Sequence, residues 1–196
     1  MKKNLYYRVM RVLSMIWFTI LYRPKIVGRE NIPKEGRCVL AGNHTKFLDP
    51  IMMIAYCKRE LHFLSKKELF DKWFRFHMIG MGCIPVDRSK KDKSVFDNAN
   101  KVLQEDGAIA IFPEGTINRT DDTIMKFKIG AVKMASDNDA VIVPFVITGK
   151  YRLFGIGKRI KLEYLEPISI GKDLDKENER LMKIVREKLE EENEKK

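Results

Sequence analysis

Short hydrophobic runs rich in valine, isoleucine and alanine recur between positions 25 and 165, bounded by glycine, proline or charged residues. Runs of this length and composition predict buried strands. We expect strands at 25–28, 38–41, 62–65, 83–86, 108–112, 140–145 and 160–165.

Between these runs lie segments with the spacing of amphipathic helices, which predict helices at 50–58, 67–78, 93–105 and 126–137. Alternating strands and helices are typical of an α/β domain, because helices connect strands that run parallel in one sheet. We therefore expect a single α/β domain with a mainly parallel sheet flanked by helices. Sites in such sheets lie in the loops beyond the carboxyl ends of the strands.

The N-terminal segment, residues 1–24, differs from the rest because basic residues precede an unbroken apolar stretch at 12–22. As a helix this stretch would reach roughly 16 Å, about half of the hydrocarbon core of a bilayer. Its basic start resembles a signal peptide, but no small-residue cleavage site follows. We favour a helix embedded in the membrane surface, with Trp17 and Tyr22 near the headgroups. The alternative is a first helix packed on the protein's own core.

The C-terminal segment, residues 173–196, carries Leu181, Ile184, Val185 and Leu189 on one helical stripe among charged residues. This pattern predicts an amphipathic helix docked on the domain, whose last residues fray. The chain thus divides into an N-terminal membrane-associated helix (1–24), a central domain (25–172) and a charged C-terminal helix (173–196).

The chain of 196 residues carries 38 Lys and Arg against 27 Asp and Glu, a formal net charge of +11. This excess favours an anionic partner, which is nucleic acid, an anionic membrane surface or an acidic substrate or carrier. The aromatic residues cluster in apolar runs instead of alternating with basic residues, and no RNA-recognition signature occurs. We therefore do not expect a nucleic-acid partner.

Cys38, Cys57 and Cys83 lie far apart and form no Cys-x-x-Cys pair, so they predict reduced thiols, mostly in the core. The three histidines also lack the spacing of metal ligands. We expect neither a metal nor a bound cofactor.

His44 and Asp49 are the first candidate pair for catalysis. On one continuous helix they would point about 140° apart, so they meet only across a turn. Pro50 favours a helix that begins there, with Asp49 as its N-cap. The Asp49 carboxylate would then orient one imidazole nitrogen and leave the other free to accept a proton. The alternatives without a catalytic role are that Asp49 only caps the helix and that His44 is a loop histidine bonded to backbone.

A second candidate is the segment Phe112-Pro113-Glu114-Gly115-Thr116, which follows an expected strand. Gly115 allows backbone amides to approach an anion, and the Thr116 hydroxyl and Arg119 would add donors. No Gly-x-x-x-x-Gly-Lys-Ser/Thr loop occurs, so the sequence does not support ATP-driven chemistry. Alone, the segment is equally consistent with a turn that ends a strand.

With these residues in view, the chain resembles the glycerolipid acyltransferases, whose best-known members acylate 1-acylglycerol 3-phosphate. Four blocks carry the resemblance in the family's order, namely Asn43 to Asp49, Gly82 to Arg88, Phe112 to Thr116 and Val141 to Phe145. The likeness spans roughly residues 25–170. The chain departs from the family pattern at Lys46, where a small polar residue is common, and at Ile117, where arginine is common; Arg119 is the nearest substitute.

The resemblance implies roles for these residues. His44 is the general base, Asp49 orients it, and Arg88, Glu114, Gly115 and Thr116 help to bind the glycerol phosphate. Arg88 offers a planar fork to phosphate oxygens, and Lys66 would add a point charge. Because a carboxylate repels phosphate, Glu114 fits better as a holder of cations or loop amides.

The implied activity is O-acyl transfer from a thioester of acyl carrier protein or coenzyme A to the sn-2 hydroxyl of lysophosphatidic acid, which gives phosphatidic acid for phospholipid biosynthesis. The implied location is the cytoplasmic face of the cell membrane, peripheral or monotopic, on an anionic surface. Two alternatives stay open. One is acylation of glycerol 3-phosphate or another lysophospholipid, and the other is a basic lipid-binding protein without catalysis.

Overall fold

The computed structural model describes residues 4–71, 74–87, 94–155 and 159–194. Its centre is a seven-stranded sheet in the order β1-β7-β6-β2-β5-β3-β4. The strands are β1 (Lys25–Val27), β2 (Cys38–Gly42), β3 (Leu61–Lys66), β4 (Ile84–Val86), β5 (Ala108–Ile111), β6 (Val141–Thr148) and β7 (Lys161–Tyr164).

The sheet is mainly parallel, as the alternation of elements predicted. Strands β6, β2, β5, β3 and β4 run in one direction, β7 is antiparallel to β6, and β1 is parallel to β7. Each expected strand forms, with small shifts at its ends. The carboxyl ends of β2, β5, β3 and β4 consequently meet at one edge of the sheet, where the sequence blocks place the candidate site.

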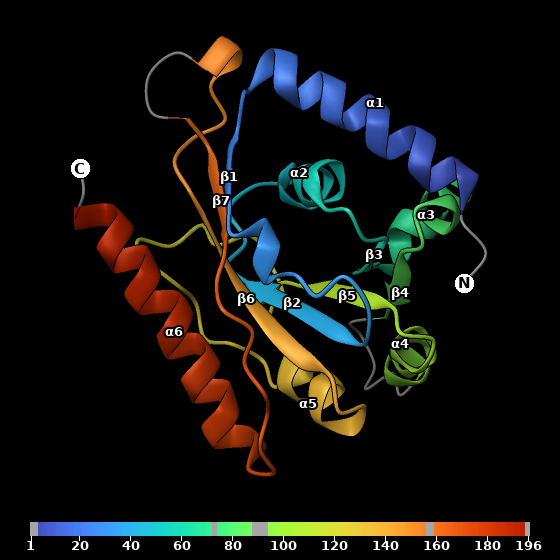
Figure 1. Cartoon of the computed structure of the whole chain (residues 1–196), viewed down its shortest axis with the longest axis vertical. Coiled ribbons are helices and arrows are strands. Elements are labelled where there is room, and N and C mark those ends of the chain that lie inside the picture. The colour runs from blue at the N-terminus through green and yellow to red at the C-terminus, as the bar shows by residue number, and fades with distance from the viewer. Residues whose placement is uncertain (1–3, 72–73, 88–93, 156–158, 195–196) are drawn as a thin grey trace.

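Helices cover both faces of the sheet (Figure 1). They are α1 (Leu5–Leu21), α2 (Asp49–Tyr56), α3 (Arg75–Gly80), α4 (Ser94–Gln104), α5 (Gly130–Asp137) and α6 (Leu174–Glu194), with short 3-10 helices η1 (Arg29–Asn31), η2 (Lys67–Phe70) and η3 (Leu153–Gly155). One face packs against α1 and α2, and the other against α4, α5 and α6.

Two expected helices are wrong in extent. In place of one helix at 67–78, the described residues form η2 and then α3, because Asp71 has extended backbone angles that end the first turn. The helix expected at 126–137 begins only at Gly130. The preceding residues serve the neighbouring loop instead, since the Lys128 N–H donates to the Pro113 carbonyl and the Phe127 side chain fills the core.

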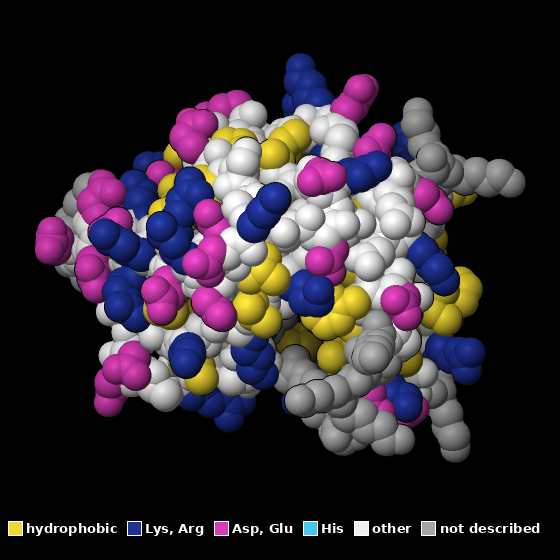
Figure 2. All heavy atoms as spheres, turned by 90° about the horizontal axis from the view of Figure 1, so that it is seen from below, with side chains coloured by type: hydrophobic (Ala, Val, Ile, Leu, Met, Phe, Trp, Pro, Cys, Tyr) yellow, Lys and Arg dark blue, Asp and Glu magenta, His cyan; other side chains and the backbone are white. Residues whose placement is uncertain are grey.

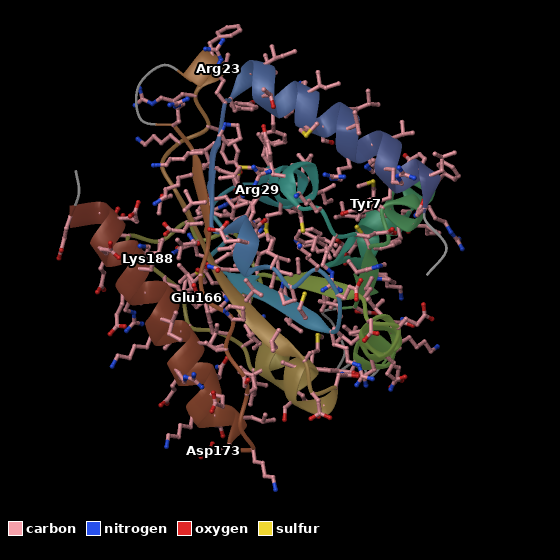
Figure 3. The ribbon with its side chains drawn as sticks, in the orientation of Figure 1. Tyr7, Arg23, Arg29, Glu166, Asp173 and Lys188 are labelled. Carbon is pink, nitrogen blue, oxygen red and sulfur yellow. The ribbon has the colours of Figure 1, made fainter. Side chains whose placement is uncertain are left out.

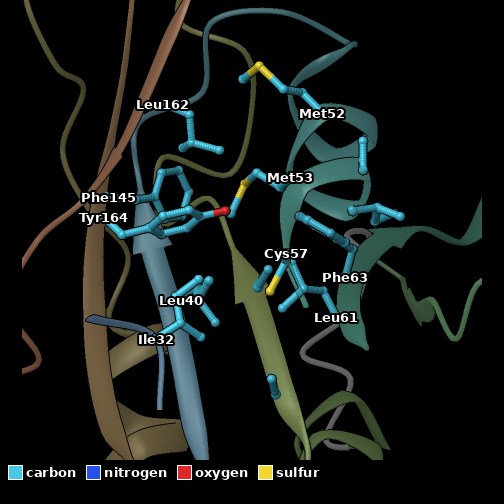
Figure 4. Packing of buried hydrophobic residues seen from close by; sticks show 14 of the residues in the cluster. Ile32, Leu40, Met52, Met53, Cys57, Leu61, Phe63, Phe145, Leu162 and Tyr164 are labelled. Atoms are coloured by element: carbon cyan, nitrogen blue, oxygen red, sulfur yellow. The ribbon is translucent and has the colours of Figure 1, made fainter. Parts of the chain in front are cut away.

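The core under α2 fixes the position of that helix on the sheet. Met53 points from α2 toward Tyr164 of β7, and Met52, Met53, Tyr164 and Phe145 of β6 are all buried (Figure 4). On the opposite face, Leu181, Val185 and Leu189 of α6 are buried, which confirms the predicted docked helix. Cys38 and Cys57 are also buried, and Cys83 is partly buried.

Helix α1 packs on the core through one stripe only. Tyr7 and Phe18 are buried, and the Tyr7 hydroxyl lies beneath the helix, where it accepts the Leu61 N–H at 2.8 Å (Figure 3). The other stripe of α1 remains exposed and apolar; it comprises Leu5, Val9, Val12, Leu13, Met15, Ile16, Trp17 and Ile20. Among the described residues, no helix has the length and apolar character needed to cross a membrane.

The face opposite α1 has a different surface. Figure 2 shows this side, where lysine and arginine side chains are interspersed with aspartate and glutamate. Contiguous exposed apolar surface is rare on monomeric soluble proteins and marks an interaction site. The contrast therefore distinguishes the α1 face as a candidate binding surface.

The Tyr7 contact makes a prediction about how α1 is held. Tyr7→Phe would leave the buried Leu61 N–H without an acceptor, so the free energy of unfolding should fall by about 1–3 kcal/mol. Urea denaturation followed by circular dichroism measures this. Tyr56→Phe is the control, because its hydroxyl bonds the exposed Thr19 side chain and its loss should cost less. Equal losses in the two variants would contradict the prediction.

Candidate active site

The loop that carries the first block is fixed where it leaves β2. The Asn43 side chain is buried and exchanges two hydrogen bonds with Ile147 of β6, of 2.9 Å to the carbonyl and 2.8 Å from the N–H. A Cβ on the preceding Gly42 would lie 2.0 Å from the Phe145 carbonyl oxygen, so only glycine fits this approach. These contacts set the position from which His44 begins.

His44 and Asp49 meet across a turn, as their spacing predicted. The distance from His44 Nδ1 to Asp49 Oδ2 is 2.9 Å, with side-chain exposures of 15% and 0%. An ionised carboxylate only accepts hydrogen bonds, so we assign the proton to Nδ1. His44 Nε2 is then left as an acceptor.

The expectation that Asp49 caps α2 is wrong. The helix begins at Asp49 itself, and Leu48 is the N-cap. The carboxylate turns back into the loop, where Oδ2 accepts the Thr45 N–H at 2.6 Å and the Lys46 N–H at 2.7 Å. Through these two bonds Asp49 closes the loop around the imidazole.

Phe112 supports the imidazole from the side. Its ring stacks on His44 with centroids 4.0 Å apart and an interplanar angle of 15°. Phe112 immediately follows β5, the parallel neighbour of β2. The stacked ring and the Asp49 carboxylate together fix both the plane and the rotation of the imidazole.

Glu114 holds the backbone of the same loop. Its Oε1 accepts the His44 N–H at 2.7 Å, and its Oε2 accepts the Met125 N–H at 2.9 Å. Burial raises the pKa of Glu114 above its ordinary value, against the opposing effect of these two amides. Both oxygens therefore face protein amides.

Those of the predicted substrate-binding residues that the structure describes lie along the same edge. Gly115 has a φ of 75°, which favours glycine. The side chains of Thr116 and Arg119 are exposed in the loop after β5, and Lys66 is exposed at the end of β3. Arg88 lies outside the described residues, two positions beyond the end of β4. Their roles stay predictions.

Two residues near the site were missed by the sequence analysis. Tyr151 donates its hydroxyl to Asp49 Oδ1 at 2.6 Å, and Lys128 places its Nζ 2.7 Å from where a Cβ on Gly115 would be. Lys128 lies in the segment 126–137, which the sequence analysis interpreted as a helix. Tyr151 lies 102 positions after Asp49 and belongs to no block, so nothing in the sequence pattern indicated it.

Over the described parts of the chain, no group of three or more histidine, cysteine, aspartate or glutamate side chains gathers in a way that would hold an ion. The site brings together the His44 imidazole, the Asp49 carboxylate and the loop at Gly115, with the Lys128 ammonium group beside that loop.

This fold and site define an acyltransferase. The sequence profile of the acyltransferase family matches residues 23–148, and the chain belongs to that family. The resemblance inferred from the four blocks is thereby confirmed, and the chain is an O-acyltransferase.

Individual relatives agree with this assignment. The chain is 32% identical over 173 residues to the 1-acyl-sn-glycerol-3-phosphate acyltransferase of Borreliella burgdorferi, covering 84% of this chain and 69% of that protein. The enzyme of the same name from Bacillus subtilis is 33% identical over 149 residues, which covers 74% and 73% of the two chains. The fold matches the crystal structure of the 1-acyl-sn-glycerophosphate acyltransferase PlsC from Thermotoga maritima, with a TM-score of 0.76 at 20% identity, over 95% of this chain and 79% of that one.

The two amides on Glu114 make a prediction about the loop. Glutamine has one acceptor oxygen in place of two, so Glu114→Gln should speed hydrogen exchange at the His44 or Met125 amide about fivefold, the equivalent of about 1 kcal/mol. Glu166→Gln, at an exposed position, is the control. Unchanged exchange at both amides would contradict the prediction.

The same variant should change the pH dependence of stability. Since the folded pKa of Glu114 is raised, the wild type loses stability as pH rises from the ordinary value near 4.5 through the folded pKa. In Glu114→Gln this loss should be absent, which unfolding measured across this pH range would show.

Proposed function

We propose that this chain is a 1-acyl-sn-glycerol-3-phosphate acyltransferase in which His44 is the general base. The observation that carries the proposal is the 2.9 Å bond from His44 Nδ1 to Asp49, which leaves Nε2 as the proton acceptor. A positioned base of this kind contributes roughly 10²- to 10⁴-fold to the rate of proton transfer. The names of the relatives support lysophosphatidic acid as the acceptor.

The reaction then needs no covalent enzyme intermediate. His44 Nε2 takes the proton of the sn-2 hydroxyl while the oxygen attacks the thioester carbonyl carbon. The carbon–sulfur bond breaks as the tetrahedral species collapses, and the imidazolium returns the proton to the leaving thiolate. The buried Asp49 carboxylate stabilises the positive imidazolium that forms between these steps. Phosphatidic acid and a free thiol are the products.

The acceptor phosphate would lie beyond the carboxyl ends of β5, β3 and β4. The described cations there include Lys66, Arg119 and Lys128, and the Gly115 amide and Thr116 hydroxyl add donors. Arg88, which lies outside the described residues, is proposed as a further cation on the sequence alone. Glu114 does not face the phosphate in this proposal. It contributes by holding the His44 loop, because both of its oxygens are occupied by amides.

We also propose that the exposed stripe of α1 binds the cytoplasmic membrane surface. Burying apolar side chains is worth about 1.5–3 kcal/mol for each large residue, and the basic chain suits anionic lipid headgroups. The excess of basic residues also suits an acidic donor, either acyl carrier protein or coenzyme A. The N-terminal helix would thus bring the site to the surface where lysolipid resides.

His44→Ala tests the catalytic proposal. The variant should fold like the wild type and lose at least about 100-fold in turnover, because it lacks the base. Mass spectrometry would follow phosphatidic acid in mixed micelles that contain lysophosphatidic acid and each thioester donor in turn. His62→Ala is the matched control, a partly buried histidine outside the loop. Product from His44→Ala at the wild-type rate would refute the role of the base.

The α1 surface is tested by a charge-matched pair of variants. Replacing Leu13 and Ile16 by glutamate should weaken binding to phosphatidylglycerol vesicles at least about tenfold, because two exposed apolar contacts are lost. Lys183→Glu on α6 lowers the net charge by the same two units and should bind nearly as the wild type does. Equal losses, measured by vesicle sedimentation, would assign binding to net charge alone.

A further inference from the structure

Tyr151 occupies a place that the reaction described above does not use. It lies in the loop after β6, and its hydroxyl donates to Asp49 Oδ1 at 2.6 Å. His44 binds the other oxygen, Oδ2. The remaining side-chain donor on Oδ1 among the described residues is the Thr45 hydroxyl, at the longer distance of 3.2 Å. Tyr151 therefore fixes the side of the carboxylate that faces away from the imidazole.

The ring of Tyr151 is held by α1. It packs edge-on against Tyr22 with centroids 5.5 Å apart, and it contacts Phe18 at 6.3 Å. Phe18 is fully buried, and its carbonyl accepts the N–H groups of Tyr22 and Arg23 where the helix ends. Figure 1 shows η3, which follows Tyr151 closely, beside this end of α1. The contacts connect α1 to the catalytic pair.

In the hydrogen bond between Tyr151 and Asp49, the tyrosine hydroxyl is the donor. Burial, and then the nearby charge of Asp49, raise the pKa of Tyr151 far above its ordinary value, so the hydroxyl remains a donor. The other titratable groups that face the pair are His44 and Glu114 from the loops after β2 and β5, and Tyr22 from α1. A donor on Oδ1 disperses the negative charge of Asp49 and limits its rotation.

We propose that Tyr151 is a positioning residue that orients Asp49, and that α1 holds Tyr151 in place for this purpose. Helix α1 thus supports the catalytic pair in addition to presenting its exposed stripe. The inference rests on the proposed function of His44 and Asp49 as base and orienting carboxylate.

Loss of the hydroxyl should have two effects on His44. Asp49 would rotate more freely and hold the imidazole less well, so kcat should fall about tenfold, the equivalent of 1.4 kcal/mol. The undispersed charge on Asp49 would favour the imidazolium, so the acid limb of the pH profile should move to higher pH. The KM for lysophosphatidic acid should stay within about twofold, because Tyr151 does not touch the proposed phosphate site.

The experiment compares Tyr151→Phe with Tyr7→Phe. Tyr151 is partly buried against α1, whereas Tyr7 is a buried residue of α1 itself, and its hydroxyl bonds the Leu61 backbone instead of Asp49. Steady-state kinetics in mixed micelles across pH would give kcat and KM, and NMR titration of the His44 imidazole would follow its pKa without turnover. We expect the displaced profile and the raised His44 pKa in Tyr151→Phe only.

Coincident profiles and titrations of Tyr151→Phe and the wild type would overturn the inference, as would equal shifts in both variants. If Tyr151→Phe does not fold, Phe18→Leu provides the test, because it loosens the packing of the Tyr151 ring and keeps the Tyr151 hydroxyl. It should move the pH profile in the same direction by a smaller amount. An unmoved profile would refute the role of α1. Wild-type turnover by His44→Ala would instead refute the proposed function itself.

Discussion

The buried carboxylate of Asp49 is the constraint on which the site depends. An ionised carboxyl group removed from water costs several kcal/mol unless donors surround it. Here the donors come from the loop after β2, through His44 and two backbone amides, and from the loop after β6, through Tyr151. Satisfying this one charge therefore holds together two segments that are far apart in the sequence, and it leaves the imidazole in a single orientation.

Glu114 is a second carboxylate that holds the loop of His44 through hydrogen bonds to backbone amides. Asp49 acts on the imidazole ring, whereas Glu114 acts on the backbone of the same residue and ties it to Met125. Both carboxylates turn their oxygens inward onto donors. A site proposed to bind an anionic substrate can therefore contain two acidic residues, because their charges are directed at protein groups. The side chains of Lys66, Arg119 and Lys128, in contrast, are exposed.

Helix α1 shows why the two sequence-based interpretations of the N-terminal segment were not exclusive. Tyr7 and Phe18 pack on the core, as a first structural helix would, while the opposite stripe exposes apolar residues, as a surface-binding helix would. A single helix has room for both stripes. The segment at 67–78 was predicted less accurately, because its helical spacing did not reveal the extended conformation of Asp71 that divides it.

The sequence by itself determined the alternation of strands and helices, the mainly parallel sheet and the pairing of His44 with Asp49. These features follow from local periodicity and from residues five positions apart, which are visible along a chain. Only the tertiary structure decided that Phe112 stacks on His44 and that Tyr151 binds Asp49 across 102 positions. Such contacts depend on which loops the order of strands brings to one edge of the sheet, and side-chain spacing in the sequence contains no record of that order.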